Sequence, residues 1–323
     1  MTLRAGIAIL PPCSATDTGI EETGWGIDFD QRLALLQAHL ERCRLCGNLC
    51  DADRIEGTSA ICGAGPKPVV TSVRLDSSKS HPLGGSLPVG TIGFLRCGLD
   101  CVYCADPKPS DLPSEEALQV DHVRLADEIL RLQEAGAAIV RFQAPTVHLP
   151  TLVPALHLAR MRGLRSPVAY GSSAFETVEA LRLLDGLVDV YFPTLKYGSE
   201  QAARVYSGVV DYVHTSRLAV KEMFRQVGPA SRGSRGGLRR GLVVRHTPIP
   251  AGMAGTVQVL TWIARNLPSD TPVCLSQSYR PVHQVAAGLF PEIARRVSQE
   301  EHDYFLSAAR QLGLSNAFPS DCD

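Results

Sequence analysis

Three cysteines separated by three and then two residues form the sharpest chemical pattern in the chain: Cys97, Cys101 and Cys104. Three thiolates on one loop can ligate three corners of a cubane [4Fe–4S] cluster and leave its fourth iron without a protein ligand. That open iron can bind a substrate or cofactor, as the open position of a catalytic zinc does, whereas a four-cysteine site is closed. The alternative is a zinc loop that has this spacing by coincidence.

A second cysteine group precedes the first and consists of Cys43, Cys46, Cys50 and Cys62. Four thiolates on a glycine-rich loop can close around zinc or around a second [4Fe–4S] cluster, and the spacing does not separate the two. A loop-rich segment of this size has little apolar area to hold it folded, so the sequence predicts a module that depends on bound metal. A role in electron relay would require iron.

The composition excludes several classes of protein. The hydrophobic content of 45% and charged content of 20% are typical of a soluble globular chain, and a net charge of −1 does not favour nucleic acid. No apolar run approaches the roughly 18–20 residues that span a bilayer, and the N-terminus resembles neither a signal peptide nor an anchor. Clustered cysteines without an export signal are typical of metal binding in a reducing compartment. We therefore expect a cytoplasmic protein that binds neither nucleic acid nor membrane.

The elements that position these cysteines follow from periodicity and turn residues. Leucines between Asp30 and Leu45 predict an amphipathic helix that leads into the first cysteine group. Glycines and prolines through Pro88 predict loops. The sequence therefore divides into an irregular lead-in with the start of a helix (1–38), a four-cysteine metal-binding module (39–88), a large α/β domain (89–315) and a tail (316–323).

After Gly90, strands and helices alternate, which is typical of a parallel sheet wrapped by helices. Six units are too few for a closed eight-stranded barrel. The sequence therefore predicts an α/β fold, an open (β/α)6 partial TIM barrel with an N-terminal cysteine-rich metal-binding module. The basic stretch 231–240 is expected to be a solvated flexible loop. The expected strands are 91–95, 138–142, 167–171, 188–192, 242–246 and 272–276; the expected helices are 123–135, 151–162, 177–185, 213–226, 256–266 and 299–312.

The loop that carries Cys97, Cys101 and Cys104 directly follows the first expected barrel strand, and this arrangement resembles the radical SAM superfamily. The resemblance implies that S-adenosylmethionine (SAM) binds the open iron through its amine and carboxylate. It also implies that an electron from the cluster cleaves SAM to a 5′-deoxyadenosyl radical, which abstracts hydrogen from an unactivated carbon. A reductant such as flavodoxin or ferredoxin is the implied protein partner.

Most of the chain, from about Cys43 to Leu314, is similar to a PflX-like branch of this superfamily related to pyruvate formate-lyase-activating enzymes. Landmarks shared with that branch occur in the same order along the chain. Besides the two cysteine groups, they are Glu176, Leu195-Lys196-Tyr197-Gly198, Val244-Arg245-His246 and Tyr279-Arg280-Pro281.

The resemblance also implies a set of SAM contacts. Tyr103 matches an aromatic residue that lies near the adenine, and Lys196 matches a lysine that contacts the SAM carboxylate. Ser172 and Ser173 follow the third strand, where polar residues approach the methionyl or ribose end. The alternatives are a surface lysine at a strand end and two serines that cap a helix.

Two positions depart from the common pattern. Gln143 begins the sequence Gln-Ala-Pro where the superfamily has Gly-Gly-Glu, so it can accept a hydrogen bond from the SAM amine but brings no negative charge. Thr194 replaces an acidic residue of the monovalent-cation site found in the activating enzymes, and we do not expect that site here. Both departures favour an enzyme that acts on a small polar molecule, for example a sugar. The alternatives are an activase that makes a glycyl radical on a protein partner and a simple electron carrier.

Cys274 suggests a specific reaction. In the last expected strand, alternation places Cys274 and Ser276 on one face and Val273 and Leu275 on the other. A thiol inside the barrel can return a hydrogen atom to a substrate radical from the opposite face and invert the carbon. This hypothesis predicts an epimerase, or a related oxidoreductase, with Cys274 as hydrogen donor. The alternative is a buried cysteine that packs as a small hydrophobe.

Overall fold

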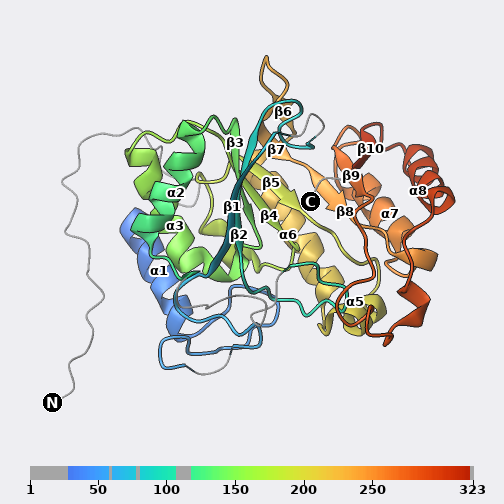
Figure 1. The fold of residues 1–323 in the computed structure, drawn as a ribbon, viewed down its shortest axis with the longest axis horizontal. Helices are drawn as coiled ribbons and strands as arrows, with labels where there is room; N and C mark the ends of the chain where they lie inside the picture. Colours follow the sequence, from blue (N-terminus) through green and yellow to red (C-terminus); the bar gives the residue numbers. More distant parts are fainter. Residues whose placement is uncertain (1–27, 58–59, 78–80, 107–117, 321–323) are drawn as a thin grey trace.

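The computed structural model describes residues 28–57, 60–77, 81–106 and 118–320, so Cys13 and Cys322 lie outside the described residues. These residues form a mixed α/β fold in which helices surround two sheets (Figure 1). No helix in these ranges is both long and apolar enough to cross a membrane.

The larger sheet has seven strands in the order β1-β2-β3-β4-β5-β7-β6. Strands β2, β3, β4, β5 and β7 run parallel to their neighbours in that group, while β1 and β6 pair antiparallel at the two edges. The strands are β1 (Val70–Asp76), β2 (Val89–Phe94), β3 (Ile139–Gln143), β4 (Val168–Ser172), β5 (Val190–Pro193), β6 (Ser231–Arg232) and β7 (Leu238–Leu242).

The smaller sheet has three parallel strands in the order β10-β9-β8, formed by β8 (Val244–His246), β9 (Val273–Ser276) and β10 (Ala317–Ser320). Only Val243 separates β7 from β8, so the strand expected at 242–246 is shared between the two sheets. A bridge between Thr194 and Arg245 places β8 beside the end of β5. The parallel strands therefore continue from one sheet to the next.

All six expected parallel strands are present, whereas β1, β6 and β10 were not predicted. The segment 317–320, which we had assigned to the tail, forms β10 and pairs with β9. The basic stretch 231–240 is an antiparallel hairpin of β6 and β7, so the expectation of a flexible loop was wrong; Arg232 Nη1 donates to Gly236 O at 2.7 Å across its turn. Strand β6 has only two residues, β10 contains Pro319, and four of the seven residues of β1 are polar, so none of the three shows a clear apolar pattern in sequence.

The seven expected helices are present, with one addition. Helix α1 ends at Glu41, before the predicted end at Leu45, so Cys43 lies just beyond it. Helix α5 was not predicted, because its eight residues include few large apolar side chains. The helices are α1 (Phe29–Glu41), α2 (His122–Glu134), α3 (Leu149–Met161), α4 (Val178–Arg182), α5 (Glu200–Ser207), α6 (Tyr212–Val227), α7 (Thr256–Asn266) and α8 (Gln299–Gln311).

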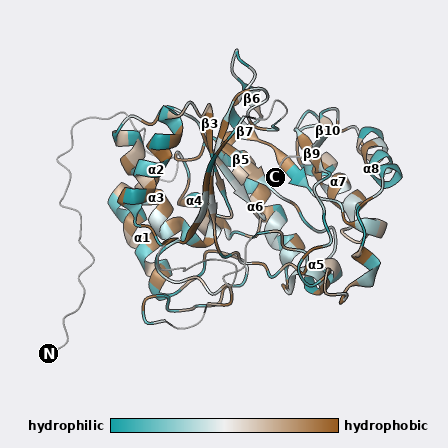
Figure 2. Ribbon diagram, viewed as in Figure 1, coloured by the Kyte–Doolittle hydropathy of each residue, from teal (hydrophilic) through white to brown (hydrophobic). Residues whose placement is uncertain are grey.

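The two faces of the parallel strands pack differently. Phe142, Tyr170 and Tyr191 belong to the main core, which includes the buried sides of the helices, and hydrophobic colouring runs along these central strands (Figure 2). The opposite, inner face holds a separate apolar cluster that includes Ile139 and Val190. Arg141 follows Ile139 on the same inner face, so this face changes from apolar to polar toward the carboxyl ends of the strands.

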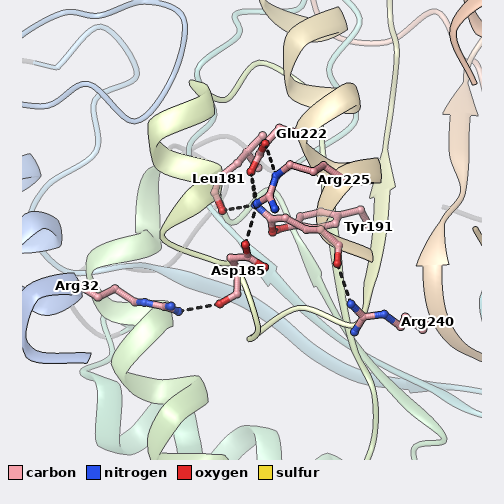
Figure 3. Close-up of polar contacts among 8 residues, drawn as sticks. Arg32, Leu181, Asp185, Tyr191, Glu222, Arg225 and Arg240 are labelled. Carbon is pink, nitrogen blue, oxygen red and sulfur yellow. Dashed lines mark hydrogen bonds and ion pairs between the residues drawn. The ribbon is translucent and has the colours of Figure 1, made fainter. Parts of the chain in front are cut away.

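A polar network, here named the Asp185 network, ties the outer helices to the sheet (Figure 3). Arg32 Nη1 donates to Asp185 O at 3.0 Å, and Arg225 Nη2 forms ion pairs with Asp185 (2.7 Å) and Glu222 (2.8 Å). Gln226 extends the network by bonding Glu222 and Leu181 O. Two more contacts at Gln226 reach the sheet, from Tyr191 OH to Oε1 and from Arg240 Nη2 to its carbonyl, both at 2.7 Å.

Candidate functional site

The Cys97 loop lies at the carboxyl end of β2, where the sequence predicted it. Cys101 is buried, Cys97 half-buried and Cys104 exposed. All three line one cavity of about 530 Å³, together with Cys62 and Asp106. The fold therefore brings the three predicted ligands to a single hollow at the end of the parallel strands.

Burial controls the protonation of these thiols. Burial, followed by the nearby Cys101, raises the pKa of Cys97 to about 12. Burial and the Asp106 carboxylate raise the pKa of Cys104 to about 11. Without a metal both groups are therefore neutral thiols at pH 7, so metal binding must displace their protons.

The loop fits a cluster better than a single ion. Within the described residues, no group of three or more His, Cys, Asp or Glu side chains is arranged to hold one metal ion. The three sulfurs instead line a common cavity. A cubane cluster assigns each cysteine to a different iron and fills the space between them. The donor set and the hollow therefore suit [4Fe–4S], and ligation by Cys97, Cys101 and Cys104 stays a prediction.

The predicted SAM contacts gather around this loop. Ser173 Oγ lies 3.8 Å from Cys97 Sγ, and Lys196 Nζ lies 5.6 Å from the centre of the Tyr103 ring. Ser172 ends β4 on the same face as Tyr170, and its Oγ accepts a hydrogen bond from the Ala174 amide at 3.1 Å. Ser172 therefore has the capping-type contact that was the alternative interpretation, and it does not line the cavity of the Cys97 loop.

Gln143 has a partner that the sequence did not suggest. Its Nε2 donates to Asp106 Oδ1 at 3.0 Å, and its Oε1 is buried with no hydrogen-bond partner among the described residues. The amide thus keeps one oxygen that can accept a hydrogen bond, and its contact with the SAM amine stays a prediction. Asp106 adds the negative charge that Gln143 lacks, and only its position two residues after Cys104 could have indicated this.

Lys196 keeps its positive charge despite its surroundings. Burial by itself lowers its pKa, but the neighbouring Cys101, Tyr103, Tyr212 and Cys104 outweigh burial and leave the pKa raised. Its backbone is held by the Tyr212 hydroxyl at 2.8 Å from the Lys196 amide nitrogen. A fixed cation therefore lies beside the cysteine loop, as a contact to a carboxylate requires.

Hydrogen bonds link the loop to helix α5. Tyr103 OH and Tyr197 OH are 2.7 Å apart, Tyr197 OH and Ser207 Oγ are 2.6 Å apart, and Ser207 Oγ lies 2.9 Å from Cys101 Sγ. We name these four residues the tyrosine–serine chain. Tyr197 appeared in the sequence only as a landmark beside Lys196. Ser207 gave no signal, because α5 itself was not recognised.

The second cysteine group adjoins the first. A Cβ atom on Gly98 would lie 3.0 Å from Cys46 Sγ, and Cys62 lines the cavity of the Cys97 loop. Cys43 and Cys46 are buried, and Cys50 and Cys62 are half-buried. Burial raises the pKa of Cys46 to about 12. Metal binding by this group stays a prediction, and the described side chains show no preformed single-ion site.

Protein contacts also hold the four-cysteine module in place. Asn48 Nδ2 donates to Gly98 O at 2.6 Å, and the Gly47 amide donates to Phe175 O at 2.8 Å. Cys46 forms a β-bridge with Glu176, whose buried carboxyl accepts from Thr146 Oγ1 at 2.6 Å. These protein contacts therefore dock the module on the strand ends.

Cys274 lies on the inner face of β9. It is fully buried in the apolar inner cluster, whereas its neighbour Leu275 belongs to the helix-facing core, which confirms the predicted alternation. Ser276 is the next inner-face residue toward the carboxyl end, and its Oγ accepts from Arg245 Nη2 at 3.1 Å. Cys274 does not line the cavity of the Cys97 loop. Its role as hydrogen donor stays a prediction.

Comparisons with known proteins give distant likenesses. No family model matches the chain. An uncharacterized protein of Methanocaldococcus jannaschii is 24% identical over 238 residues, which cover 71% of this chain, and the chain spans only 64% of that relative.

Three solved structures illustrate the structural likeness. A radical SAM methyltransferase from Sphaerobacter thermophilus aligns with a TM-score of 0.48 and 13% identity over 75% of this chain and 67% of its own. HydG, a maturase of the [FeFe]-hydrogenase, gives 0.47 and 16% over 69% and 48%. A mutant of spore photoproduct lyase gives 0.47 and 14% over 78% and 80%. Scores and identities this low leave the function to be argued from the site itself.

Proposed function

We propose that this protein is a radical SAM enzyme. The observation that carries the proposal is the cavity at the end of β2, which Cys97, Cys101 and Cys104 line together. These three residues would hold a [4Fe–4S] cluster with one open iron. When bound, the cluster supplies the electron that cleaves SAM to methionine and a 5′-deoxyadenosyl radical.

The chain's own residues would bind and orient SAM. Lys196 would pair with the SAM carboxylate, while Gln143 Oε1 and the Asp106 carboxylate would face the amine. These groups match the opposite charges of an amino acid's two ends. The Tyr103 ring, held by its hydrogen bond to Tyr197, would lie against the adenine.

The inner face supports a small polar substrate. Arg141 and Arg245 project from β3 and β8, and two hydroxyls, those of Ser276 and Ser278, accept hydrogen bonds from Arg245 at 3.1 and 3.0 Å. Such groups can orient hydroxyls or carboxylates of a substrate, as those of a sugar. The proposal does not depend on a protein substrate.

Epimerisation is the specific reaction we propose. The Cys274 thiol would donate a hydrogen atom to the substrate carbon radical and become a thiyl radical, which an electron and a proton would restore. Its inner-face position supports this role. The four-cysteine module would hold a second metal, and iron there would pass electrons from a flavodoxin- or ferredoxin-type reductant. Such chemistry fits the reducing cytoplasm.

The experiment is anaerobic reconstitution with iron and sulfide, followed by addition of dithionite and SAM. We expect one [4Fe–4S] cluster at the Cys97 loop and formation of 5′-deoxyadenosine. Changing Cys97, Cys101 and Cys104 together to Ala should abolish this product. Undiminished cleavage in the triple variant would overturn the proposal, and metal analysis of the same variant identifies what the four-cysteine module holds.

Cys274 has its own test once a substrate is identified. The Cys274→Ala variant should still form 5′-deoxyadenosine but should no longer epimerise. A variant that epimerises at the normal rate, with solvent deuterium entering the product, would remove Cys274 from the mechanism.

A further inference from the structure

The tyrosine–serine chain ends on a sulfur that the proposed function assigns to the cluster. Two of its members, Ser207 and Tyr197, are almost completely buried, with exposed fractions of 0% and 2%. The backbone fixes this meeting point, because the Asp100 amide donates to Ser207 O at 3.2 Å and the Val102 amide to Tyr206 O at 3.0 Å. The end of α5 is therefore clamped to both sides of Cys101.

Metal ligation would set the direction of every hydrogen bond in this chain. A Cys101 thiolate bound to iron has no proton, so it can only accept, and Ser207 must donate to it. The Ser207 hydroxyl has then used its one proton, so it must accept from Tyr197. Tyr197 in turn accepts from Tyr103. In the metal-free thiol form the bonds can run either way, so only the ligated state requires a single direction.

We propose that Ser207 is a positioning residue that tunes the reduction potential of the cluster through its hydrogen bond to Cys101, with Tyr197 orienting its hydroxyl. This inference rests on the proposed function. A hydrogen bond to a ligand sulfur stabilises the more negative, reduced cluster, and hydrogen bonds to sulfur are among the factors that set cluster potentials. Tyr103 is the first member of the tyrosine–serine chain. A ligand that displaces the Tyr103 hydroxyl from Tyr197 would therefore alter the hydrogen bond that Cys101 accepts.

The lengths of the three hydrogen bonds and the burial of the residues that form them support tuning of the reduction potential over a role in packing alone. All three bonds measure between 2.6 and 2.9 Å, and they form one continuous path from the predicted adenine contact to the predicted cluster ligand. In a poorly solvated interior, linked hydrogen bonds polarise one another and strengthen. A serine present only to fill space would not need two hydrogen-bonding partners in line.

The test is the midpoint potential of the reconstituted cluster in Ser207→Ala, Tyr197→Phe and a matched control. We expect Ser207→Ala to lower the equilibrium constant for one-electron reduction about tenfold, which makes the midpoint potential about 59 mV more negative. Tyr197→Phe should lower this equilibrium constant about twofold. Ser216→Ala removes another buried serine hydroxyl, which donates to Val213 O on α6, and should change nothing.

A spectroscopic measurement accompanies the potentials. In deuterated buffer, the reduced wild-type cluster should show an exchangeable-deuteron coupling that is lost in Ser207→Ala. Unchanged potential and unchanged coupling in Ser207→Ala would overturn the inference. If Ser207→Ala does not retain the cluster, Tyr197→Phe decides, and an unshifted potential there would count against the chain. A wild-type protein that binds no cluster would instead refute the proposed function.

Discussion

Two polar networks in this molecule have similar hydrogen bonds but different endpoints. The Asp185 network is centred on ion pairs, since Arg225 pairs with both Asp185 and Glu222. The tyrosine–serine chain consists of neutral hydroxyls and ends on Cys101. The ion pairs of the first network join side chains of the protein itself, although Arg32 Nε is buried without a hydrogen-bond partner among the described residues. The second ends on an atom whose expected chemistry requires a bound group.

This difference separates stability from function. Charge pairs that close on themselves stabilise the native packing and have no further binding capacity. The neutral hydroxyls of the second network lie beside Lys196, whose Nζ is 5.6 Å from the centre of the Tyr103 ring, in the region where we propose that a cluster and SAM bind. Variants of the first network should therefore change stability, and variants around the second should change cluster and SAM chemistry.

The largest expected effect is on chemistry alone. Cys104→Ala should lower SAM cleavage by at least about 1,000-fold, because the reaction depends on the complete ligand set. Cys104 is exposed, so the free energy of unfolding of the metal-free protein should change by no more than about 0.5 kcal/mol. Urea denaturation and product analysis on the same preparation measure both. A large loss of stability would contradict the idea that variants around the cysteine loop change chemistry and not stability.

Gly98→Ala tests whether the two cysteine groups depend on each other. The added Cβ would meet Cys46 Sγ at 3.0 Å, and such overpacking costs about 1–3 kcal/mol. We expect cluster binding at the Cys97 loop to weaken about tenfold, and the four-cysteine module to lose metal as well. Gly65→Ala, in the four-cysteine module with no atom within 4 Å of its Cβ position and no positive φ, controls for backbone effects of removing a glycine. Normal iron content in Gly98→Ala would show that the groups are independent.

Arg225→Ala should affect stability alone. Its guanidinium is 48% exposed, so solvent weakens the pairs, but Glu222 is left buried, and we expect a loss of about 1–2 kcal/mol. SAM cleavage per cluster should not change. Although burial opposes it, hydrogen bonds from Arg225 and Gln226 lower the pKa of Glu222. The stabilisation is therefore present above the ordinary glutamate pKa of about 4.5 and is lost as the pH falls through the lower native pKa.

Urea denaturation between pH 7 and pH 3 measures this effect, and the difference between wild type and Arg225→Ala should shrink toward acid. Arg310→Ala, at an exposed arginine of α8, is the matched control. A pH-independent difference would mean that Arg225 acts through packing.

The smallest effect is expected at the start of α8, far from both networks. Glu301 completes a capping box with Ser298 and pairs with Arg295, and these contacts lower its pKa to about 2. Glu301→Gln should cost about 0.5–1 kcal/mol at pH 7. Because the native pKa is depressed, the difference should persist down to about pH 4.5 and vanish as the pH falls through about 2. Thermal unfolding across this range checks the prediction.

The sequence predicted the repetitive parts of this fold and missed the short ones. Parallel strands such as β3 and helices such as α7 carry long apolar patterns, so their positions could be read directly. Strand β10 contains a proline and helix α5 has few large apolar residues, so neither shows a clear apolar pattern. Their missing prediction also concealed Ser207, because a serine becomes informative only when α5 places it beside Cys101.

The site divides in the same way. The cysteine spacing indicated three residues that meet at one cavity, and the family resemblance indicated Lys196 and Ser173, both of which lie against the loop. Asp106 and the contact between Gly98 and Cys46 depend on side chains from separate segments meeting in space. No local pattern encodes such a meeting.

The docking of the four-cysteine module has a consequence for protein synthesis. Cys46 bridges Glu176, which follows it by 130 residues, so this contact cannot form until both residues have been synthesised. At about 5–20 residues per second, a ribosome needs about 6.5–26 s to add that length. During this interval Cys46 lacks this contact. We therefore expect metal delivery and oxidative damage to compete for the cysteines of the module before the chain is fully translated.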